Sequence, residues 1–350
     1  MRIAQVMLAR GFGGAERSFV DLSRALAARG HEVLAIGERD GMALPKLAGI
    51  PHVTTVGVRC LGSWDPFTVR AIRHELANFR PDVVQAHLAR AARLAGRAAH
   101  AQGLPTLAKT HNLVKTPYYK DIDLLVPTTQ AQSTHLVNAG IEPARIRRIP
   151  NFSGLVPVAE PPLAHPGPPL LKTLGRFVAK KGFAVLLDAF AAVHAARPDA
   201  RLVIGGDGPD AEALRQQARA LGLADAVEFS GWIDDIATFL ADASLFVLPS
   251  HDEPFGIVLL EAMARGVPIV TTPAVGPREI LPADAAFFSD RDDVPALIAA
   301  LEEALCDPRG AHARARRALQ LFCEHYSEEV IVARYEALYR ELTPRSHVGS

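Results

Sequence analysis

Short, almost wholly apolar runs alternate along the chain with longer segments whose apolar residues recur at helical spacing. An apolar run without polar alternation is typical of a strand buried on both faces of a parallel sheet. Helical segments follow such runs, for example 17–29, which Gly30 ends, and 255–264, which Gly266 ends. The pattern therefore predicts an α/β fold with parallel sheets. The predicted strands are 2–8, 33–36, 82–87, 105–112, 124–127, 170–174, 201–204, 245–248 and 267–271.

A proline-rich stretch divides this pattern into two halves. Residues 156–169 hold six prolines, which is typical of a linker, and the strand-and-helix pattern starts again after it. A length of 350 residues also favours two domains. We expect an N-terminal domain over residues 1–163 and a C-terminal domain over residues 164–327.

The most informative stretch is 245–281, where a strand, a loop and a helix carry two carboxylates. Glu253 precedes the helix and Glu261 lies about two turns into it, so the two are roughly 10–12 Å apart. A glycosidase pair is about 5–10 Å apart, which is closer than this spacing allows. The free N–H groups of a helix N-terminus bind phosphate. The spacing suits two carboxylates at opposite ends of a nucleotide-sugar whose pyrophosphate lies between them.

Several motifs in this order resemble one family, the retaining glycosyltransferases of family 4 (glycosyltransferase group 1), which have the GT-B fold. Glu253 and Glu261 form its E-x7-E element within EPFG…LLEAMA, and 13–16 resembles its GGAE turn. Residues 175–182 resemble its G-R-x4-K-G element. The segment 149–152 resembles I-P-N-G, with Phe152 in place of the glycine. The resemblance covers nearly the whole chain.

The resemblance implies two Rossmann-like domains that face each other across a cleft. The nucleotide-sugar is then expected mainly on the second domain and the acceptor mainly on the first. A C-terminal helix, 328–343, is expected to cross back onto the first domain.

The same resemblance implies roles for individual residues. Catalytic roles fall to the residues that hold the sugar and the departing diphosphate: His111, Arg176, Lys181 and Glu253. Donor binding falls to Gly13, Gly14, Gly231, Trp232, Ile233, Phe255, Gly256, Ile257 and Glu261. Neither a cofactor nor a catalytic metal is implied, and the donor is a nucleotide-diphosphate sugar.

Three other features suggest alternatives. The opening turn invites a dinucleotide interpretation, with Glu38 as the ribose-binding acid, but Glu16 occupies the position of the third glycine. Asp121 and Asp123 match the D-x-D pattern of metal-dependent transferases, yet they precede a buried strand in the first half, and we reject a metal site there. His87 ends a strand, either as a neighbour of the ligand crevice or as a structural histidine.

Charge separates the two halves although the net charge is zero. Residues 1–165 carry 20 Lys and Arg against 12 Asp and Glu, a net charge of +8, and the rest carries the opposite excess. Arg90, Arg93, Arg97 and His100 fall on one helical stripe, which is either a solvated face or a contact with an anionic membrane. Aromatic residues are sparse, so nucleic acid is not an expected partner.

Three scattered cysteines and a first segment too short for a signal peptide indicate the cytoplasm, with a possible peripheral position on the membrane. The sequence thus predicts a retaining hexosyltransferase that acts on a lipopolysaccharide core, another envelope glycan or a lipid-linked acceptor. The alternatives are a sugar-nucleotide epimerase, an inverting GT-B transferase or a non-catalytic sugar-nucleotide-binding protein. The sugar, the nucleotide, the acceptor and the oligomeric state are not specified by the sequence.

Overall fold

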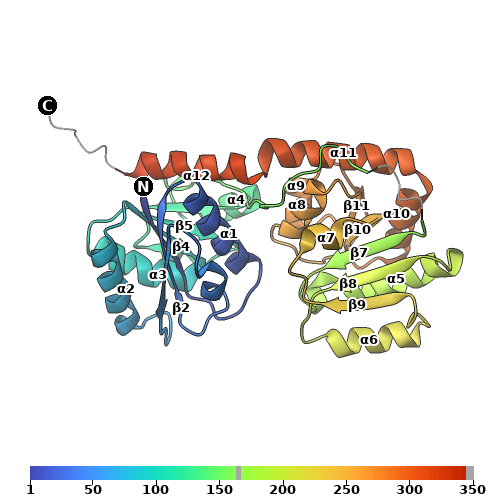
Figure 1. The fold of residues 1–350 in the computed structure, drawn as a ribbon, viewed down its shortest axis with the longest axis horizontal. Helices are drawn as coiled ribbons and strands as arrows, with labels where there is room; N and C mark the ends of the chain where they lie inside the picture. Colours follow the sequence, from blue (N-terminus) through green and yellow to red (C-terminus); the bar gives the residue numbers. More distant parts are fainter. Residues whose placement is uncertain (163–166, 344–350) are drawn as a thin grey trace. The chain divides into compact units, whose positions relative to one another are not determined.

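The computed structural model describes residues 1–162 and 167–343, and the chain divides into two compact units (Figure 1). The first unit comprises residues 1–154 together with the C-terminal segment from Glu328. The second comprises Leu155–Ser327. The predicted domain boundary, between Leu163 and Ala164, lies outside the described residues.

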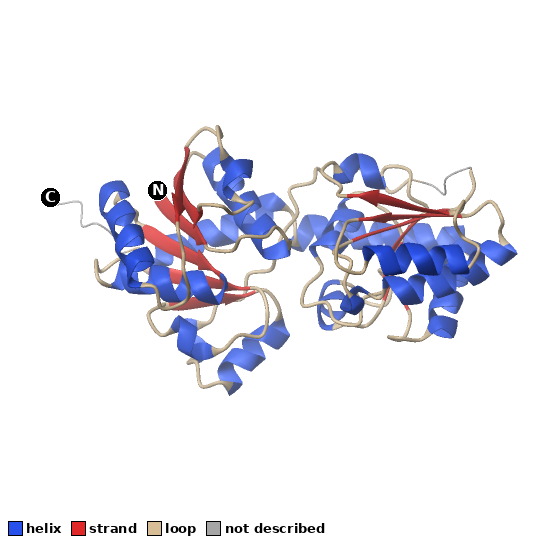
Figure 2. Ribbon diagram, turned by 90° about the horizontal axis from the view of Figure 1, so that it is seen from below, coloured by secondary structure: helices blue, strands red, loops and turns tan. Residues whose placement is uncertain are grey.

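Each unit contains one sheet of six parallel strands, with helices on both faces (Figure 2). In the first unit the strand order is β3-β2-β1-β4-β5-β6. These strands are β1 (Arg2–Met7), β2 (Glu32–Glu38), β3 (Val53–Val58), β4 (Val83–His87), β5 (Thr106–Thr110) and β6 (Leu124–Pro127). In the second unit the order is β12-β11-β10-β7-β8-β9. These strands are β7 (Leu170–Leu174), β8 (Arg201–Gly205), β9 (Val227–Gly231), β10 (Leu245–Leu248), β11 (Ile269–Thr271) and β12 (Phe287–Phe288).

The helices begin where the sequence offers caps. Asp65 accepts the amide hydrogen of Phe67 at the start of α2, and Asp293 accepts that of Ala296 at the start of α10. The first unit holds α1 (Gly14–Ala28), α2 (Pro66–Phe79), α3 (Leu88–His100), α4 (Gln130–Asn138) and the short 3-10 turns η1 (Leu44–Leu47), η2 (Thr116–Tyr119) and η3 (Pro143–Arg145). The second holds η4 (Ala179–Lys181), α5 (Phe183–Ala196), α6 (Ala211–Ala220), α7 (Ile236–Leu240), α8 (Ile257–Ala264), α9 (Val275–Ile280), α10 (Val294–Cys306) and α11 (Pro308–His325).

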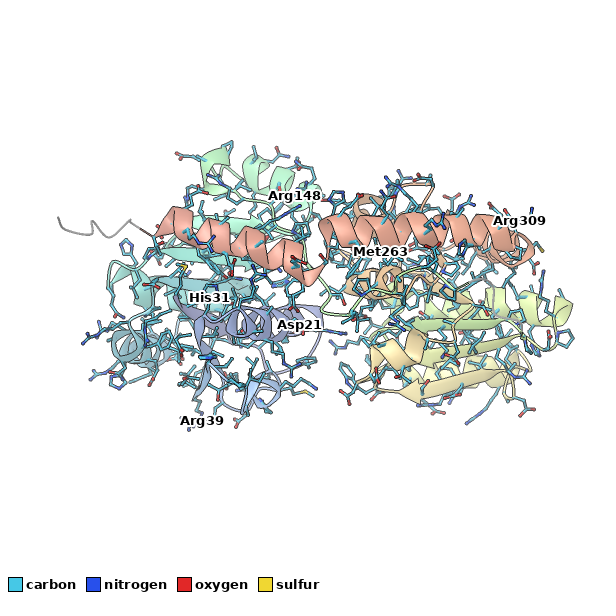
Figure 3. The ribbon with its side chains drawn as sticks, turned by 45° about the horizontal axis from the view of Figure 1, so that its top comes forward. Asp21, His31, Arg39, Arg148, Met263 and Arg309 are labelled. Carbon is cyan, nitrogen blue, oxygen red and sulfur yellow. The ribbon has the colours of Figure 1, made fainter. Side chains whose placement is uncertain are left out.

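The last helix, α12 (Glu328–Leu342), belongs to the first unit, as the resemblance implied. Its buried Ile331 and Tyr335 lie in one hydrophobic cluster with Ile3 of β1. The buried carboxylate of Glu336 on the same helix accepts hydrogen bonds from Arg29 and His31, each at 2.9 Å (His31 is labelled in Figure 3). The apolar face and this ion pair together dock the end of the chain on the N-terminal sheet.

In both sheets the chain starts at a central strand, builds toward one edge and then returns to the other side. The reversal falls between β1 and β4 in the first unit and between β7 and β10 in the second. Such switch points leave a crevice at the carboxyl ends of the strands, where α/β proteins bind ligands. The fold therefore directs attention to the loops after these four strands.

Candidate functional site

At the switch point of the second unit, the structure brings two predicted site residues together. Lys181 ends η4, after β7, and Glu253 follows β10. The Lys181 ammonium lies 2.5 Å from a carboxylate oxygen of Glu253, and only 17% and 9% of the two side chains are exposed. A cation and an acid thus share a mostly buried position where the crevice is expected.

Glycines allow the loops of this site to approach closely. Gly182 has a φ of +69°, and a Cβ there would lie 2.0 Å from the carbonyl oxygen of Pro249. The amide of His251 donates to the carbonyl of Lys180 at 2.9 Å, which ties the loop after β10 to η4. Gly206, with a φ of +124°, would place a Cβ 1.9 Å from the carbonyl oxygen of Gly175. These contacts give a physical reason for Gly182 in the G-R-x4-K-G segment and for Gly206 in the turn after β8.

The helix that carries Glu261 begins at Ile257, two residues later than the sequence predicts. Gly256 precedes it with a φ of +93°, a left-handed conformation that interrupts a helix starting at Phe255. The Phe255 ring turns into the core, 6.4 Å from the ring of Tyr326. The N–H groups at the start of α8 are therefore those that follow Gly256, and Glu261 is fully buried further along the helix.

The remaining predicted residues of this unit lie at the same edge of the sheet. Arg176 follows β7 and is exposed. Gly231 ends β9 with a φ of +71°, and its carbonyl accepts the amide hydrogen of Gly206 at 2.6 Å. Trp232 is 55% exposed, whereas Ile233 is partly buried. An exposed indole next to a backbone turn offers a flat surface for a base.

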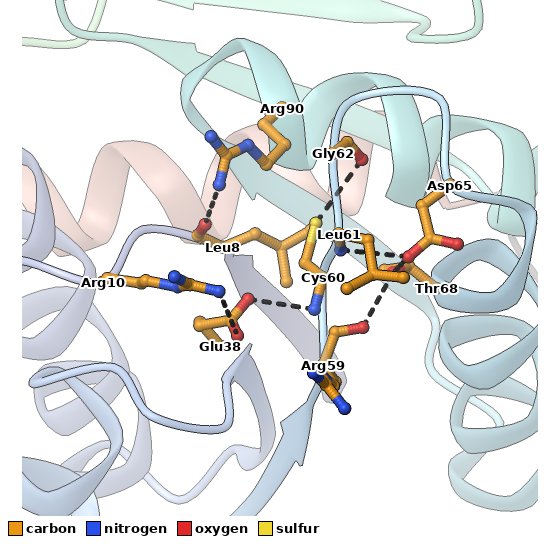
Figure 4. A network of polar contacts seen from close by, with 10 residues as sticks. All are labelled: Leu8, Arg10, Glu38, Arg59, Cys60, Leu61, Gly62, Asp65, Thr68 and Arg90. Carbon is orange, nitrogen blue, oxygen red and sulfur yellow. Dashed lines mark hydrogen bonds and ion pairs between the residues drawn. The ribbon is translucent and has the colours of Figure 1, made fainter.

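In the first unit, the glycine turn after β1 is engaged with its own helix. The Gly13 amide donates to the Glu16 carboxylate at 2.9 Å, and Gly14 begins α1. Glu38 is not placed to bind a ribose, because it is 1% exposed and its carboxylate accepts the amide hydrogen of Cys60 at 3.1 Å (Figure 4). The dinucleotide interpretation therefore lacks both a ribose-binding acid and the third glycine of its motif.

Two histidines lie together at the other predicted position of the first unit. His111, just after β5, is 9% exposed, and its Nε2 lies 3.4 Å from the Nδ1 of His87, which is fully buried at the end of β4. Burial lowers the pKa of both rings well below the usual value, and the charge of Lys109 adds to this. Leu88, next to His87, has a φ of +67°, a strained value for a branched residue. Both imidazoles are therefore neutral near pH 7.

The sequence patterns do not predict one buried lysine in this region as a functional residue. Lys109 on β5 is fully buried, its Nζ donates to Ser18 at 2.9 Å, and burial lowers its pKa to about 7. Ser18 in turn donates to the side-chain oxygen of Asn151 at 3.2 Å. The available signal was that Lys109 is the only charged residue in the strand Thr106–Thr110.

The basic stripe is only partly solvated. Arg93 is 5% exposed, with its guanidinium 3.1 Å from the ring centroid of Trp64. Arg97 and His100 on the same helix are exposed. The interpretation of all four residues as one solvated face is therefore wrong at Arg93, because an aromatic side chain from the loop after β3 covers it.

The rejected D-x-D motif has a structural role. A carboxylate oxygen of Asp123 accepts the amide and hydroxyl hydrogens of Thr106, each at 2.8 Å. Over residues 1–162 and 167–343, no three His, Cys, Asp or Glu side chains are grouped so that they could hold a metal ion. Within the same ranges, every helix is too short or too polar to cross a lipid bilayer.

Comparison with known proteins places these motifs in a family. Residues 12–152 match the family "Glycosyltransferase Family 4" and residues 159–320 match "Glycosyl transferases group 1". The lipopolysaccharide core biosynthesis glycosyltransferase LpsE of Rhizobium meliloti is 31% identical over 92% of this chain and 94% of its own length. LpsD of the same organism is also 31% identical, over 93% and 95%.

Solved structures agree on the fold. Alr3699/HepE of Anabaena, solved with UDP, superposes with a TM-score of 0.81 at 21% identity, over 98% of this chain and all of the other. The lipopolysaccharide outer core galactosyltransferase WaaB gives a TM-score of 0.75 at 19% identity, again over 98% and 100%. The folded units, the ordered motifs and these relatives lead to one conclusion: the chain belongs to the group 1 glycosyltransferases and has their two-domain GT-B fold.

Proposed function

We propose that this glycosyltransferase moves a hexosyl unit from a nucleotide-diphosphate sugar to a cell-envelope glycan or a lipid-linked acceptor, without a metal and with retention at the anomeric carbon. The observation that carries the proposal is the contact between Lys181 and Glu253 at the switch point of the second unit. A diphosphate is bound by a fixed cation, and the hydroxyls of a sugar are bound by a group that accepts their hydrogen bonds. Lys181 and Glu253 offer both groups side by side.

The leaving group is the negative nucleoside diphosphate. The ammonium of Lys181, the exposed guanidinium of Arg176 and the N–H groups at the start of α8 stabilise the charge that develops on it. When the donor binds, its phosphate takes over part of the interaction that Lys181 makes with Glu253. The carboxylate of Glu253 is then available to the hydroxyls of the sugar.

The other roles follow from the family resemblance. Glu261 binds the ribose, and the backbone of Gly231–Ile233 contacts the base. His111 positions the sugar through one of its ring nitrogens. No residue is assigned as a nucleophile, so the departing phosphate helps to activate the acceptor on the same face of the sugar.

The relatives suggest the donor and the acceptor. LpsE and LpsD are named for lipopolysaccharide core biosynthesis, and HepE was solved with UDP and with UDP-glucose. We therefore propose a UDP-sugar donor and a lipopolysaccharide core oligosaccharide as the acceptor.

The melting temperature of the protein, measured with a panel of UDP-, GDP- and ADP-sugars, tests the donor. Binding to the native state raises stability, so UDP-sugars should raise the melting temperature most. NMR of the product then gives its anomeric configuration, and EDTA should leave the rate unchanged. An inverted product would contradict retention, and a donor that binds without transfer or hydrolysis would favour a binding protein.

A peripheral membrane contact is the second part of the proposal. Leu61, Trp64 and Phe67 are 71%, 70% and 76% exposed around the loop between β3 and α2, in the unit that carries the excess of basic residues. Exposed apolar side chains with basic neighbours favour an anionic bilayer.

Flotation with anionic and neutral liposomes tests this contact. The triple variant L61S/W64S/F67S should stay at the bottom of the gradient, whereas V137S, which alters an exposed apolar residue on α4, should float like the wild type. Equal flotation of both variants would exclude the loop as the contact.

A further inference from the structure

A chain of hydrogen bonds between uncharged side chains connects the neighbour of His111, His87, with the last helix of the first unit, α12. From the helix inward, it runs through Tyr339, the two glutamines Gln85 and Gln5, and His87. All four side chains are fully buried, and we call them the Tyr339 network. The motifs of the family do not include Tyr339, Gln5 or Gln85.

The direction of each bond can be worked out from the tyrosine. Its hydroxyl oxygen lies 2.6 Å from the side-chain oxygen of Gln85, a distance typical of O–H···O rather than N–H···O bonds. The hydroxyl therefore donates its only hydrogen to Gln85. Burial raises the pKa of Tyr339, so this hydrogen is retained.

The remaining contact of Tyr339 fixes the amide of Gln5. The tyrosine has no second hydrogen, so at 3.2 Å it must accept one from the Gln5 side-chain nitrogen. The Gln5 oxygen then faces the other way, 2.8 Å from Nε2 of His87. An amide oxygen only accepts, which means that His87 carries its hydrogen on Nε2. The nitrogen of Gln85, also a donor, stays further from the same atom, at 3.3 Å.

His87 passes this assignment on to His111. A neutral imidazole with hydrogen on Nε2 has a lone pair on Nδ1, and that atom lies 3.4 Å from Nε2 of His111. His111 therefore donates from Nε2 and keeps a lone pair on Nδ1. Among the described residues, no hydrogen bond reaches this Nδ1.

We propose that Tyr339 is a positioning residue: through Gln85, Gln5 and His87 it holds His111 in the Nε2–H tautomer, so that Nδ1 accepts a hydrogen from a hydroxyl of the bound sugar. This inference rests on the proposed role of His111 and specifies its chemistry. The imidazole serves as a hydrogen-bond acceptor for a hydroxyl, and a deoxygenated sugar that lacks the matching hydroxyl gains nothing from it.

The first experiment is ¹⁵N NMR of the histidine-labelled protein near pH 7, because the ring nitrogen shifts distinguish the tautomers directly. The His111→Gln spectrum assigns the signal. In the wild type, Nε2 of His111 should carry the hydrogen and Nδ1 should not. Y339F should give a mixture of the two neutral tautomers, whereas Y119F should not change the spectrum. Tyr119 is a matched control, since it is equally buried in the same unit and its hydroxyl makes no hydrogen bond to any described residue.

The second experiment is a double-mutant cycle on transfer. Y339F should lower kcat/KM by roughly 3- to 10-fold, the value of one hydrogen bond, with wild-type far-UV circular dichroism. In the H111A background the same change should have no further effect, because Tyr339 acts on the sugar only through the tautomer of His111. Q5M cuts the network at a second point and should behave like Y339F.

Two results would overturn the proposal. One is an Nδ1–H tautomer at His111 in the wild type. The other is a Y339F loss of equal size with and without His111, which indicates a purely structural tyrosine. The NMR result does not depend on catalysis, so it stands even if no donor is found, and absence of transfer would count against the proposed function alone.

Discussion

The two switch points of this protein have the same strand topology, but one carries charged side chains and the other neutral ones. In the second unit a charged pair, Lys181 and Glu253, lies among loops that glycines bring into backbone contact. In the first, two neutral histidines, His87 and His111, end a hydrogen-bonded chain. A fixed ammonium suits an anionic group such as a phosphate, whereas a neutral imidazole suits a neutral group such as a hydroxyl.

The largest effect is expected from removing the cation of the second switch point. K181A should lower turnover by about 10²–10³, the range for one preorganised charge stabiliser. K180A is the matched control, because the neighbouring lysine is exposed and pairs only loosely with Asp252, at 3.6 Å. Steady-state kinetics measure both variants, and near-wild-type turnover of K181A would remove this lysine from the mechanism.

The close backbone packing of the same site can be tested separately from its charge. G206A places a methyl group on the Gly175 carbonyl and should lower the free energy of unfolding by roughly 3 kcal/mol. Gly222 also has a positive φ but open space around it, so G222A should cost only about 1 kcal/mol. Urea unfolding gives both values. Equal losses would mean that backbone conformation, and not the contact, explains the glycine.

In the first unit, the ion pair at Glu336 is expected to hold α12 in place and not to bind the ligand. Contact with Arg29, and then His31, lowers the pKa of Glu336 to about 2, from a usual value of 4.5. A lowered pKa stabilises the fold above the usual value, and this contribution is lost as the pH falls from about 5 toward 2. E336Q should cost roughly 2 kcal/mol at pH 7 and flatten the acid limb of the stability profile.

The control for this variant is E341Q. Glu341 lies on the same helix as Glu336 and forms an exposed ion pair with Arg147, so its loss should change the free energy of unfolding by less than about 1 kcal/mol. Urea midpoints between pH 3 and pH 7 provide the measurement. If E336Q kept the acid sensitivity of the wild type, another carboxylate would be responsible for it.

The sequence predicts the fold because buried parallel strands leave a strong apolar signal. It misses β3, whose Thr54 and Thr55 are exposed at the edge of the sheet, so the apolar run is broken. It also starts α8 too early, since the left-handed conformation of Gly256 follows from packing and not from helix propensity.

The candidate site is only partly predictable, for a different reason. The E-x7-E and G-R-x4-K-G spacings lie within single loops and helices, so the sequence preserves their geometry. The pairing of Lys181 with Glu253 and the burial of Arg93 under Trp64 depend on side chains from separate elements. The Tyr339 network joins residues more than 250 positions apart, a relation that no local pattern encodes.

The position of α12 has a consequence for how the polypeptide is made. Residues 155–327 form a continuous stretch, so the second unit can complete its core as soon as it leaves the ribosome. The first unit begins synthesis earlier, yet it lacks Ile331, Val332 and Tyr335 until the residues that follow the second unit are translated. The half of the enzyme that is made first is therefore the half that matures last.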